Sequence, residues 1–212
     1  MNPSHENATR LLDPIRSARP ILLVVAASTE ARSVVAGVTG SRPEALRVLW
    51  EPQQLDERVS LLLTGVGKAN AAGAVGHALA RETFGAIVSI GIGGALPTDE
   101  SAATYHHERG DIVRCERSVF ADEGVISSSG WESMADRGFG PRIDLPESDS
   151  MAIDADARAL DLLSERFPAS GSAATVSTCS GTDEAAWATA SRSGCTVEAM
   201  EGAAVGLVAL RL

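Results

Sequence analysis

The carboxylates in a segment of small residues are the part of this sequence best suited to chemistry. Residues 197–205 contain Glu198 and the pair Met200-Glu201, followed by Gly202 and a run of Ala and Val. These small, mostly apolar side chains offer few hydrogen-bond partners to the Glu201 carboxylate, which could therefore bind a ligand. The alternative is that Glu198 and Glu201 belong to the first turn of an amphipathic helix, where the helix dipole stabilises acidic residues.

Three other segments carry candidate site residues. Glu30 lies just after an apolar run, at the predicted start of a helix, where a dipole-stabilised first-turn acid is the alternative. The glycine turn 65–68 could present backbone N–H groups to an anion or a sugar, but it matches neither the dinucleotide fingerprint nor the phosphate-binding loop. Segment 91–94 has three glycines in four residues, which indicates close backbone approach or positive φ and is typical of a ligand loop.

An alternation of strands and helices is predicted to position these segments. Apolar runs at 21–27, 59–63 and 86–90 are each followed by Gly, Ser or Thr and then by a helix-like stretch. This pattern is typical of parallel strands buried on both faces. Further strands are predicted at 111–119 and 175–179, and helices at 31–38, 69–83, 154–167 and 182–192. We therefore expect an α/β fold, with a mixed, mostly parallel twisted sheet flanked by helices and the site at the carboxyl ends of the strands.

Length and charge restrict the function classes. A chain of 212 residues with 44% hydrophobic content suits one core and does not demand a second domain. Residues 1–19 are polar and aperiodic, so we expect a flexible leader before a domain at 20–212. The net charge of -10 and the lack of a basic stripe argue against nucleic acid as the main partner.

Cysteines and histidines give no sign of a metal or redox centre. Cys115, Cys179 and Cys195 lack metal-ligand and redox spacing, so we expect reduced thiols in a cytoplasmic protein. His106 and His107 are adjacent in a polar segment, which is more typical of a surface loop than of a metal site. The longest apolar run, 21–27, is too short to span a bilayer. We expect no metal, no cofactor and no membrane partner.

Taken together, these segments resemble the nucleoside phosphorylase and nucleosidase superfamily. The resemblance extends from about residue 21 to 212 and also includes Gly-Asp-Ile-Val at 110–113. Its specific parts are 64–70, 120–124, 175–182 and 199–205. Within the superfamily the chain is most similar to the futalosine hydrolases, the nucleosidases of menaquinone biosynthesis. The 5′-methylthioadenosine/S-adenosylhomocysteine nucleosidases share the plan but usually differ at 120–124 and around Cys179, and they are the close alternative.

The resemblance implies a role for each candidate residue. Cleavage of an N-ribosyl bond passes through an oxocarbenium-like transition state, which needs a positioned water, a nearby negative charge and help for the departing base. By resemblance, Glu30 activates the water, and Glu201 accepts hydrogen bonds from the ribose hydroxyls beside Met200. The remaining implied substrate contacts are Gly91, Ile92 and Gly93 near the ribose, Thr178, Cys179, Ser180 and Gly181 near the purine, and Phe120 where a second subunit of a homodimer closes the pocket.

The sequence departs from the family after the Met-Glu segment. Family members continue with a last strand, a loop that assists departure of the base and a covering helix, whereas this sequence ends at Leu212. Acid–base assistance is worth roughly a hundred- to ten-thousand-fold in rate, so we expect impaired turnover. A non-catalytic nucleoside-binding remnant is the further alternative.

Phosphorolysis is a weaker prediction than hydrolysis. The glycine turn 65–68 contains no arginine to hold phosphate, and we expect Lys68 to point to solvent. Asp122 and Glu123 could touch a ligand or a neighbouring subunit, or could form a solvated turn.

Overall fold

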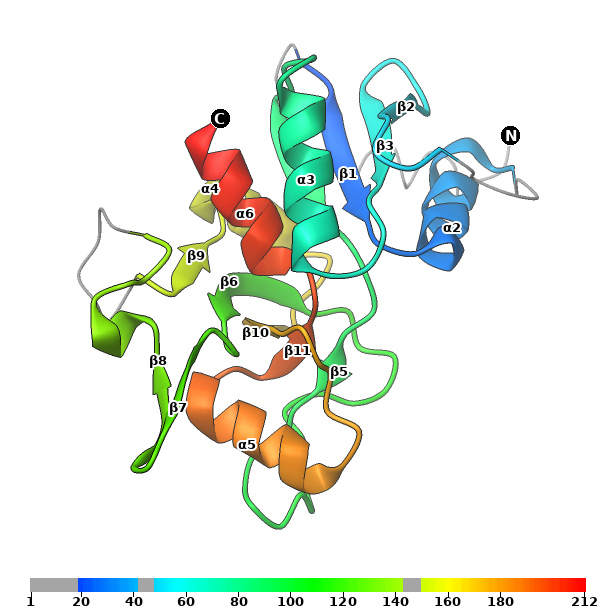
Figure 1. Cartoon of the computed structure of the whole chain (residues 1–212). Helices are drawn as coiled ribbons and strands as arrows, with labels where there is room; N and C mark the ends of the chain where they lie inside the picture. Colours follow the sequence, from blue (N-terminus) through cyan, green and yellow to red (C-terminus); the bar gives the residue numbers. More distant parts are fainter. Residues whose placement is uncertain (1–18, 42–47, 143–149) are drawn as a thin grey trace.

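Strand β1 (Ile21–Val25) lies inside a four-stranded sheet and is buried along its whole length (Figure 1). The computed structural model describes residues 19–41, 48–142 and 150–212, so most of the expected leader, 1–18, lies outside the described residues. β1 pairs in parallel with β3 (Val59–Leu63) and β4 (Ala86–Ser89), and the short β2 (Gln53–Gln54) runs antiparallel to β3. The three predicted apolar strands are therefore confirmed.

A second, five-stranded sheet is built around β10 (Ser170–Thr175). β10 pairs in parallel with β6 (Arg114–Phe120) and β11 (Val197–Ala199). Two short antiparallel strands form the edges, β5 (Gly94–Ala95) beside β11 and β9 (Ala152–Asp154) beside β6. The predicted α/β fold with mixed, mostly parallel pairing is confirmed, but the strands divide between two sheets. The glycine-rich segment 90–93 carries the chain from β4 in the first sheet to β5 in the second.

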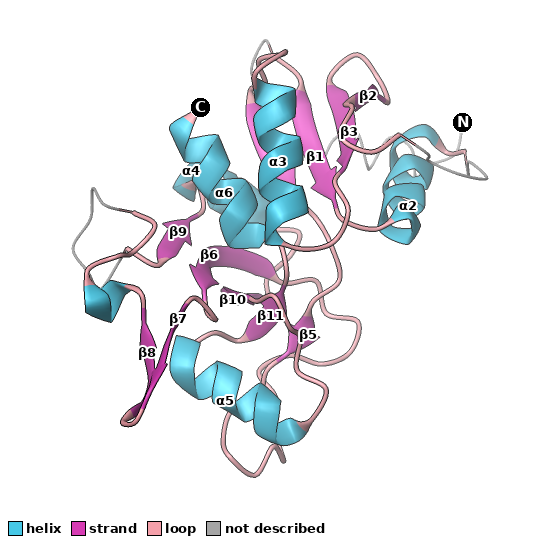
Figure 2. Ribbon diagram, in the orientation of Figure 1, coloured by secondary structure: helices cyan, strands magenta, loops and turns pink. Residues whose placement is uncertain are grey.

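Helices pack against the faces of the sheets (Figure 2). Alternate residues of β1 face opposite sides, as strand geometry requires. One side packs against α2 (Ser28–Thr39), and the other packs against α3 (Lys68–Leu79) and α6 (Gly202–Arg211). The second sheet is covered by α5 (Asp183–Ser193), and α4 (Ala157–Ser164) precedes β10. The alanines of α3 and α6 let these two helices approach each other and the sheet closely.

Several element boundaries differ from the sequence predictions. The helix predicted at 154–167 is Ala157–Ser164, because Asp154 ends strand β9, and the helix predicted at 69–83 ends at Leu79. The strand predicted at 175–179 lies at Ser170–Thr175, because neighbouring β6 and β11 supply ladders to a segment of small residues that has no apolar run. The strand predicted from 111 begins at Arg114. The last helix begins only at Gly202, because Val197–Ala199 is paired into the sheet. Glu198 is therefore a strand residue, and the alternative that placed it in the first turn of a helix is wrong.

A β-hairpin that the sequence did not predict projects from the second sheet. It consists of β7 (Gly124–Ser127) and β8 (Gly130–Ser133), followed by the 3-10 helix η2 (Ala135–Arg137). Among the described residues, no helix combines the length and apolar character needed to cross a membrane.

Candidate active site

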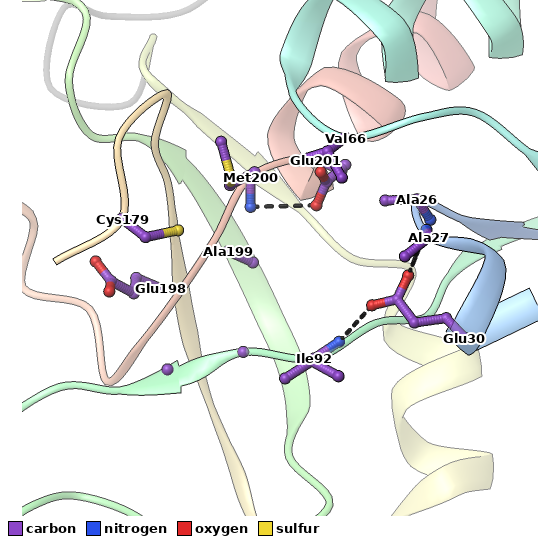
Figure 3. Close-up of a pocket in the computed structure, with 12 residues that line it drawn as sticks. Ala26, Ala27, Glu30, Val66, Ile92, Cys179, Glu198, Ala199, Met200 and Glu201 are labelled. Carbon is purple, nitrogen blue, oxygen red and sulfur yellow. Dashed lines mark hydrogen bonds between the residues drawn. The ribbon is translucent and has the colours of Figure 1, made fainter. Parts of the chain in front are cut away.

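A cavity of about 330 Å³ lies where segments from both sheets meet (Figure 3). It is bounded by the end of β1, the first turn of α2, the glycine segment between β4 and β5, and the junction of β11 with α6. The predicted site residues that line it are Glu30, Ile92, Gly93, Cys179, Met200 and Glu201. The fold thus brings together residues that are up to 171 positions apart in the sequence (201 − 30).

The Glu30 carboxylate accepts hydrogen bonds from backbone N–H groups of two segments, the end of β1 and the glycine-rich segment. Oε2 accepts from Ala26 N at 3.1 Å and Ala27 N at 2.9 Å, and Oε1 accepts from Ile92 N at 2.9 Å. The bond to Ala27 caps the N-terminus of α2. Glu30 is therefore an acidic residue in the first turn of a helix, as the structural alternative predicted. A carboxylate has about four acceptor positions. Residues of the described part of the chain fill three of them and leave one on Oε1 for a water molecule.

The need for glycine at position 91 follows from the place of Glu30. Gly91 does not line the cavity, but a Cβ atom there would lie 3.1 Å from Glu30 Oε1. This distance is shorter than an ordinary van der Waals contact, so a side chain at position 91 would require the Glu30 carboxylate to shift by a few tenths of an ångström. Gly91 therefore acts on the site through Glu30.

The Glu201 carboxylate occupies the N-terminus of α3. Its Oε1 accepts from Gly67 N at 2.7 Å and its Oε2 from Met200 N at 3.2 Å. Gly67 is the N-cap of α3 and has φ of 97°, a conformation that favours glycine. The backbone N–H of Gly67 in the glycine turn thus binds the protein's own carboxylate. Among the residues that the structure describes, each oxygen of Glu201 accepts one hydrogen bond, and the acceptor position left on each suits the two hydroxyls of a vicinal diol.

Lys68 does not point to solvent, so that prediction was wrong. Its Nζ lies 2.5 Å from Asp122 Oδ1 and 3.2 Å from Glu123 Oε1, and its side chain is only 15% exposed. Asp122 also accepts from the backbone N–H of Ser177. Burial raises the pKa of Asp122, but the hydrogen bonds from Lys68 and Ser177 outweigh it and leave the pKa below its ordinary value. Asp122 therefore joins the α3 turn to the loop that follows β10.

Glu198 lines the cavity, although the sequence pattern did not predict it as a site residue. Only 6% of it is exposed, and it faces the cavity from β11. Its Oε1 accepts from Ser180 N at 2.9 Å and its Oε2 from Ser180 Oγ at 2.8 Å. Val197 and Glu198 are consecutive residues of a short buried strand, a pattern too brief to distinguish from the start of a helix.

Cys179 lies beside this carboxylate, at the cavity wall. Burial, together with the negative charges of Glu198 and Glu201, raises the pKa of its thiol. A raised pKa keeps the thiol protonated near neutral pH, which is unfavourable for a nucleophile. Cys179 therefore lines the cavity as an uncharged thiol.

Four predicted contacts besides Gly91 do not line the cavity. Phe120 is 5% exposed and packs in the core, with Lys68 Nζ 5.9 Å from its ring centroid. Thr178, Ser180 and Gly181 belong to the loop between β10 and α5, where Ser180 acts on the cavity through Glu198.

The paired histidines His106 and His107 lie in the segment between β5 and β6. His107 Nε2 lies 3.1 Å from Thr196 Oγ1, which ties its segment to β11. Within residues 19–41, 48–142 and 150–212, no group of three His, Cys, Asp or Glu residues is arranged to hold a metal ion.

Comparisons with known proteins agree with this fold. Among solved structures, a variant of Helicobacter pylori MTAN with 5′-methylthioadenosine in its active site shares 16% identity with the chain. It has a TM-score of 0.66, over 91% of this chain and 80% of that one. Streptococcus pneumoniae MTA/SAH nucleosidase in complex with 8-aminoadenine gives 18% identity and the same TM-score and coverage. The Neisseria meningitidis 5′-methylthioadenosine/S-adenosylhomocysteine nucleosidase, bound to methylthio-immucillin-A, gives 16% identity and a TM-score of 0.65 over 90% and 80%.

Sequence comparison identifies the family. No curated protein sequence matches the chain. A family model described as the phosphorylase superfamily matches residues 20–212, which is nearly the whole chain. The chain therefore belongs to the phosphorylase superfamily.

Proposed function

We propose that this protein hydrolyses the N-ribosyl bond of futalosine, releasing hypoxanthine and dehypoxanthine futalosine in menaquinone biosynthesis. The observation that carries the proposal is the pairing of two carboxylates in one cavity. Glu30 and Glu201 are both held by backbone N–H groups, and both keep open acceptor positions. One open position suits a water molecule and two suit a ribose diol, which are the requirements of ribosyl hydrolysis.

The geometry supports a division of labour between these carboxylates. Glu201 would accept hydrogen bonds from the 2′ and 3′ hydroxyls and hold the ribose at the N-terminus of α3. Glu30 would accept a proton from the water that attacks C1′, as in glycosidases that use one carboxylate as a base. The negative charges of both residues would stabilise the positive charge that develops on the sugar ring.

Hydrolysis is favoured over phosphorolysis by the charges at the cavity. The Gly67 N–H group is already donated to Glu201, and Lys68 is already paired with Asp122 and Glu123. The charged groups among the described lining residues are carboxylates, which would repel phosphate. Turnover that is independent of added phosphate would support hydrolysis, and phosphate-dependent formation of the 1-phosphate of dehypoxanthine futalosine would contradict it.

The futalosine assignment is tested by comparing the rate of turnover of futalosine with the rates for the substrates of the alternative function. The solved structures quoted above are MTA/SAH nucleosidases, so 5′-methylthioadenosine and S-adenosylhomocysteine are the comparison substrates. The purified 212-residue chain should release hypoxanthine from futalosine faster than it releases adenine from either alternative. The matched variants are Glu201→Gln, which should lose turnover, and Glu184→Gln on the exposed start of α5, which should retain it.

The rate of base release from futalosine also tests whether turnover is impaired. The titratable side chains among the described lining residues are three glutamates and Cys179. None of these is a cationic donor for the departing purine, so we propose slow turnover or nucleoside binding without turnover. Ligand binding by the unmodified chain, lost in Glu201→Ala and unaccompanied by base release, would identify the binding-only alternative.

We also propose a homodimer that covers the mouth of the cavity. Val66 and Ile92 line the cavity and are 53% and 82% exposed. A second subunit over them would remove apolar surface from water and exclude solvent from the reaction. Light scattering coupled to size-exclusion chromatography should give twice the monomer mass, and Ile92→Asp should shift it toward the monomer.

A further inference from the structure

Glu198 is a buried carboxylate that the proposed mechanism does not use. It lies on β11 with 6% of its surface exposed and lines the same cavity as Glu30 and Glu201. In the described part of the chain, its oxygens accept hydrogen bonds only from Ser180, through the backbone N–H and the hydroxyl. Burial of a carboxylate is costly unless its oxygens are well hydrogen-bonded. One acceptor position on each oxygen remains for a ligand.

The glycine-rich segment places Glu198 and Glu30 at opposite ends of the cavity. At one end, Ile92 donates to Glu30 Oε1, and a Cβ atom on Gly91 would lie 3.1 Å from the same oxygen. At the other end, Gly94 pairs with Glu198 across the β5–β11 ladder, and a Cβ atom on Gly94 would lie 3.3 Å from Glu198 Oε1. In Figure 3, Cys179 and Glu198 lie on one side, Glu30 lies on the other, and Glu201 lies between them.

Stereochemistry then decides which part of a nucleoside meets Glu198. Water held by Glu30 attacks C1′ from the face opposite the departing base, as in displacement at a sugar carbon. With the ribose on Glu201, the base must extend away from Glu30. That direction leads to the end of the cavity formed by Glu198 and Cys179.

We propose that Glu198 determines base specificity by accepting a hydrogen bond from the N1–H group of a 6-oxopurine. This inference rests on the proposed function, in which the leaving base is hypoxanthine. N1 of hypoxanthine carries a hydrogen and is a donor, whereas N1 of adenine is an acceptor that a carboxylate repels. A purine without a substituent at C6 also has an acceptor at N1. Glu198 therefore favours hypoxanthine over both.

Binding of free bases to the intact chain tests this role without requiring turnover. Calorimetric titration with hypoxanthine, adenine and unsubstituted purine is performed on the unmodified protein and on Glu198→Gln. Loss of a charge-assisted hydrogen bond should weaken hypoxanthine binding by roughly 10- to 100-fold. Adenine and unsubstituted purine should bind Glu198→Gln as tightly as the unmodified protein or more tightly, because N1 of each is an acceptor that the carboxylate repels and an amide does not.

A second variant separates base recognition from support of the loop. Ser180→Ala removes the hydroxyl donor to Glu198 Oε2 but leaves the carboxylate and the backbone donor in place. It should retain the preference for hypoxanthine that Glu198→Gln loses. If Glu198 only anchors the loop, Ser180→Ala will resemble Glu198→Gln, and all three bases will weaken together.

Three results would overturn the proposal. These are equal weakening of all three bases in Glu198→Gln, tighter binding of adenine than hypoxanthine by the unmodified protein, and no binding of hypoxanthine at all. Failure of the proposed function is seen separately, as no base release from futalosine by a protein whose base binding still depends on Glu198.

Discussion

Gly67 donates its backbone N–H to Glu201 Oε1 across 2.7 Å, although 134 positions separate the two residues. This bond joins the first turn of α3 to the residue that precedes α6, two helices that pack against each other beside the first sheet. Gly67 can direct its N–H toward the carboxylate because its φ of 97° is accessible to glycine. The position of the proposed ribose ligand therefore depends on one backbone conformation far away in the sequence.

Replacement of Gly67 by alanine should impair the site without filling any space. No atom lies within 4 Å of the added Cβ, so the expected cost arises from the positive φ alone. We expect unfolding to become easier by about 1 kcal/mol and ribonucleoside binding to weaken by roughly tenfold. Gly37→Ala in the exposed part of α2 is the control, because its Cβ also meets nothing but its φ is helical. Thermal unfolding and calorimetry of both variants check the prediction, and equal binding by both would contradict it.

Glu30→Gln and Glu201→Gln should separate catalysis from binding. Glu30→Gln removes the proposed base, so kcat should fall by roughly a hundred- to ten-thousand-fold with a small change in KM. Glu201→Gln alters the proposed diol ligand and the bond to Gly67, so KM should rise as kcat falls. Steady-state kinetics with futalosine distinguish the two patterns. An unchanged kcat in Glu30→Gln would remove Glu30 from the mechanism.

The ion pair between Lys68 and Asp122 should contribute stability that depends on pH. Because the pKa of Asp122 is lower in the folded protein than its ordinary value of 3.8, the contribution is present above that value. It is lost as the pH falls through the lower, folded value. Asp122→Asn should therefore reduce Tm near neutral pH, and this difference should shrink below about pH 3.8. Melting curves from neutral to acidic pH test this, with Asp161→Asn on the exposed face of α4 as the control.

Thiol labelling should report occupancy of the cavity. Cys179 is exposed, whereas Cys195 is buried and Cys115 is partly buried. Since burial and two carboxylates raise the pKa of Cys179, its alkylation should be slow near neutral pH and accelerate above pH 9. Hypoxanthine or futalosine should protect Cys179, as measured by peptide mass spectrometry. Equal labelling with and without ligand would place the base elsewhere.

The apolar sequence pattern was sufficient to predict the three parallel strands of the first sheet, but not the short polar β2 at its edge. Runs such as Ile21–Val25 are buried on both faces, so each residue type directly reports its environment. β10 was predicted too far along the sequence, because its small residues carry no such pattern. The strand is held instead by hydrogen bonds to β6 and β11. Local composition identifies a strand only when the side chains themselves provide the stabilising burial.

By itself, the sequence determined the fold class, the place of Glu30 near the start of a helix and the candidate carboxylate Glu201, because these depend on local patterns and on family resemblance. The tertiary structure decided the partners of these groups. Glu201 meets Gly67, Lys68 meets Asp122, and Glu198 is buried against Ser180. The physical reason is that strand register and helix packing bring these distant residues together, and no local pattern records which donor will face which carboxylate.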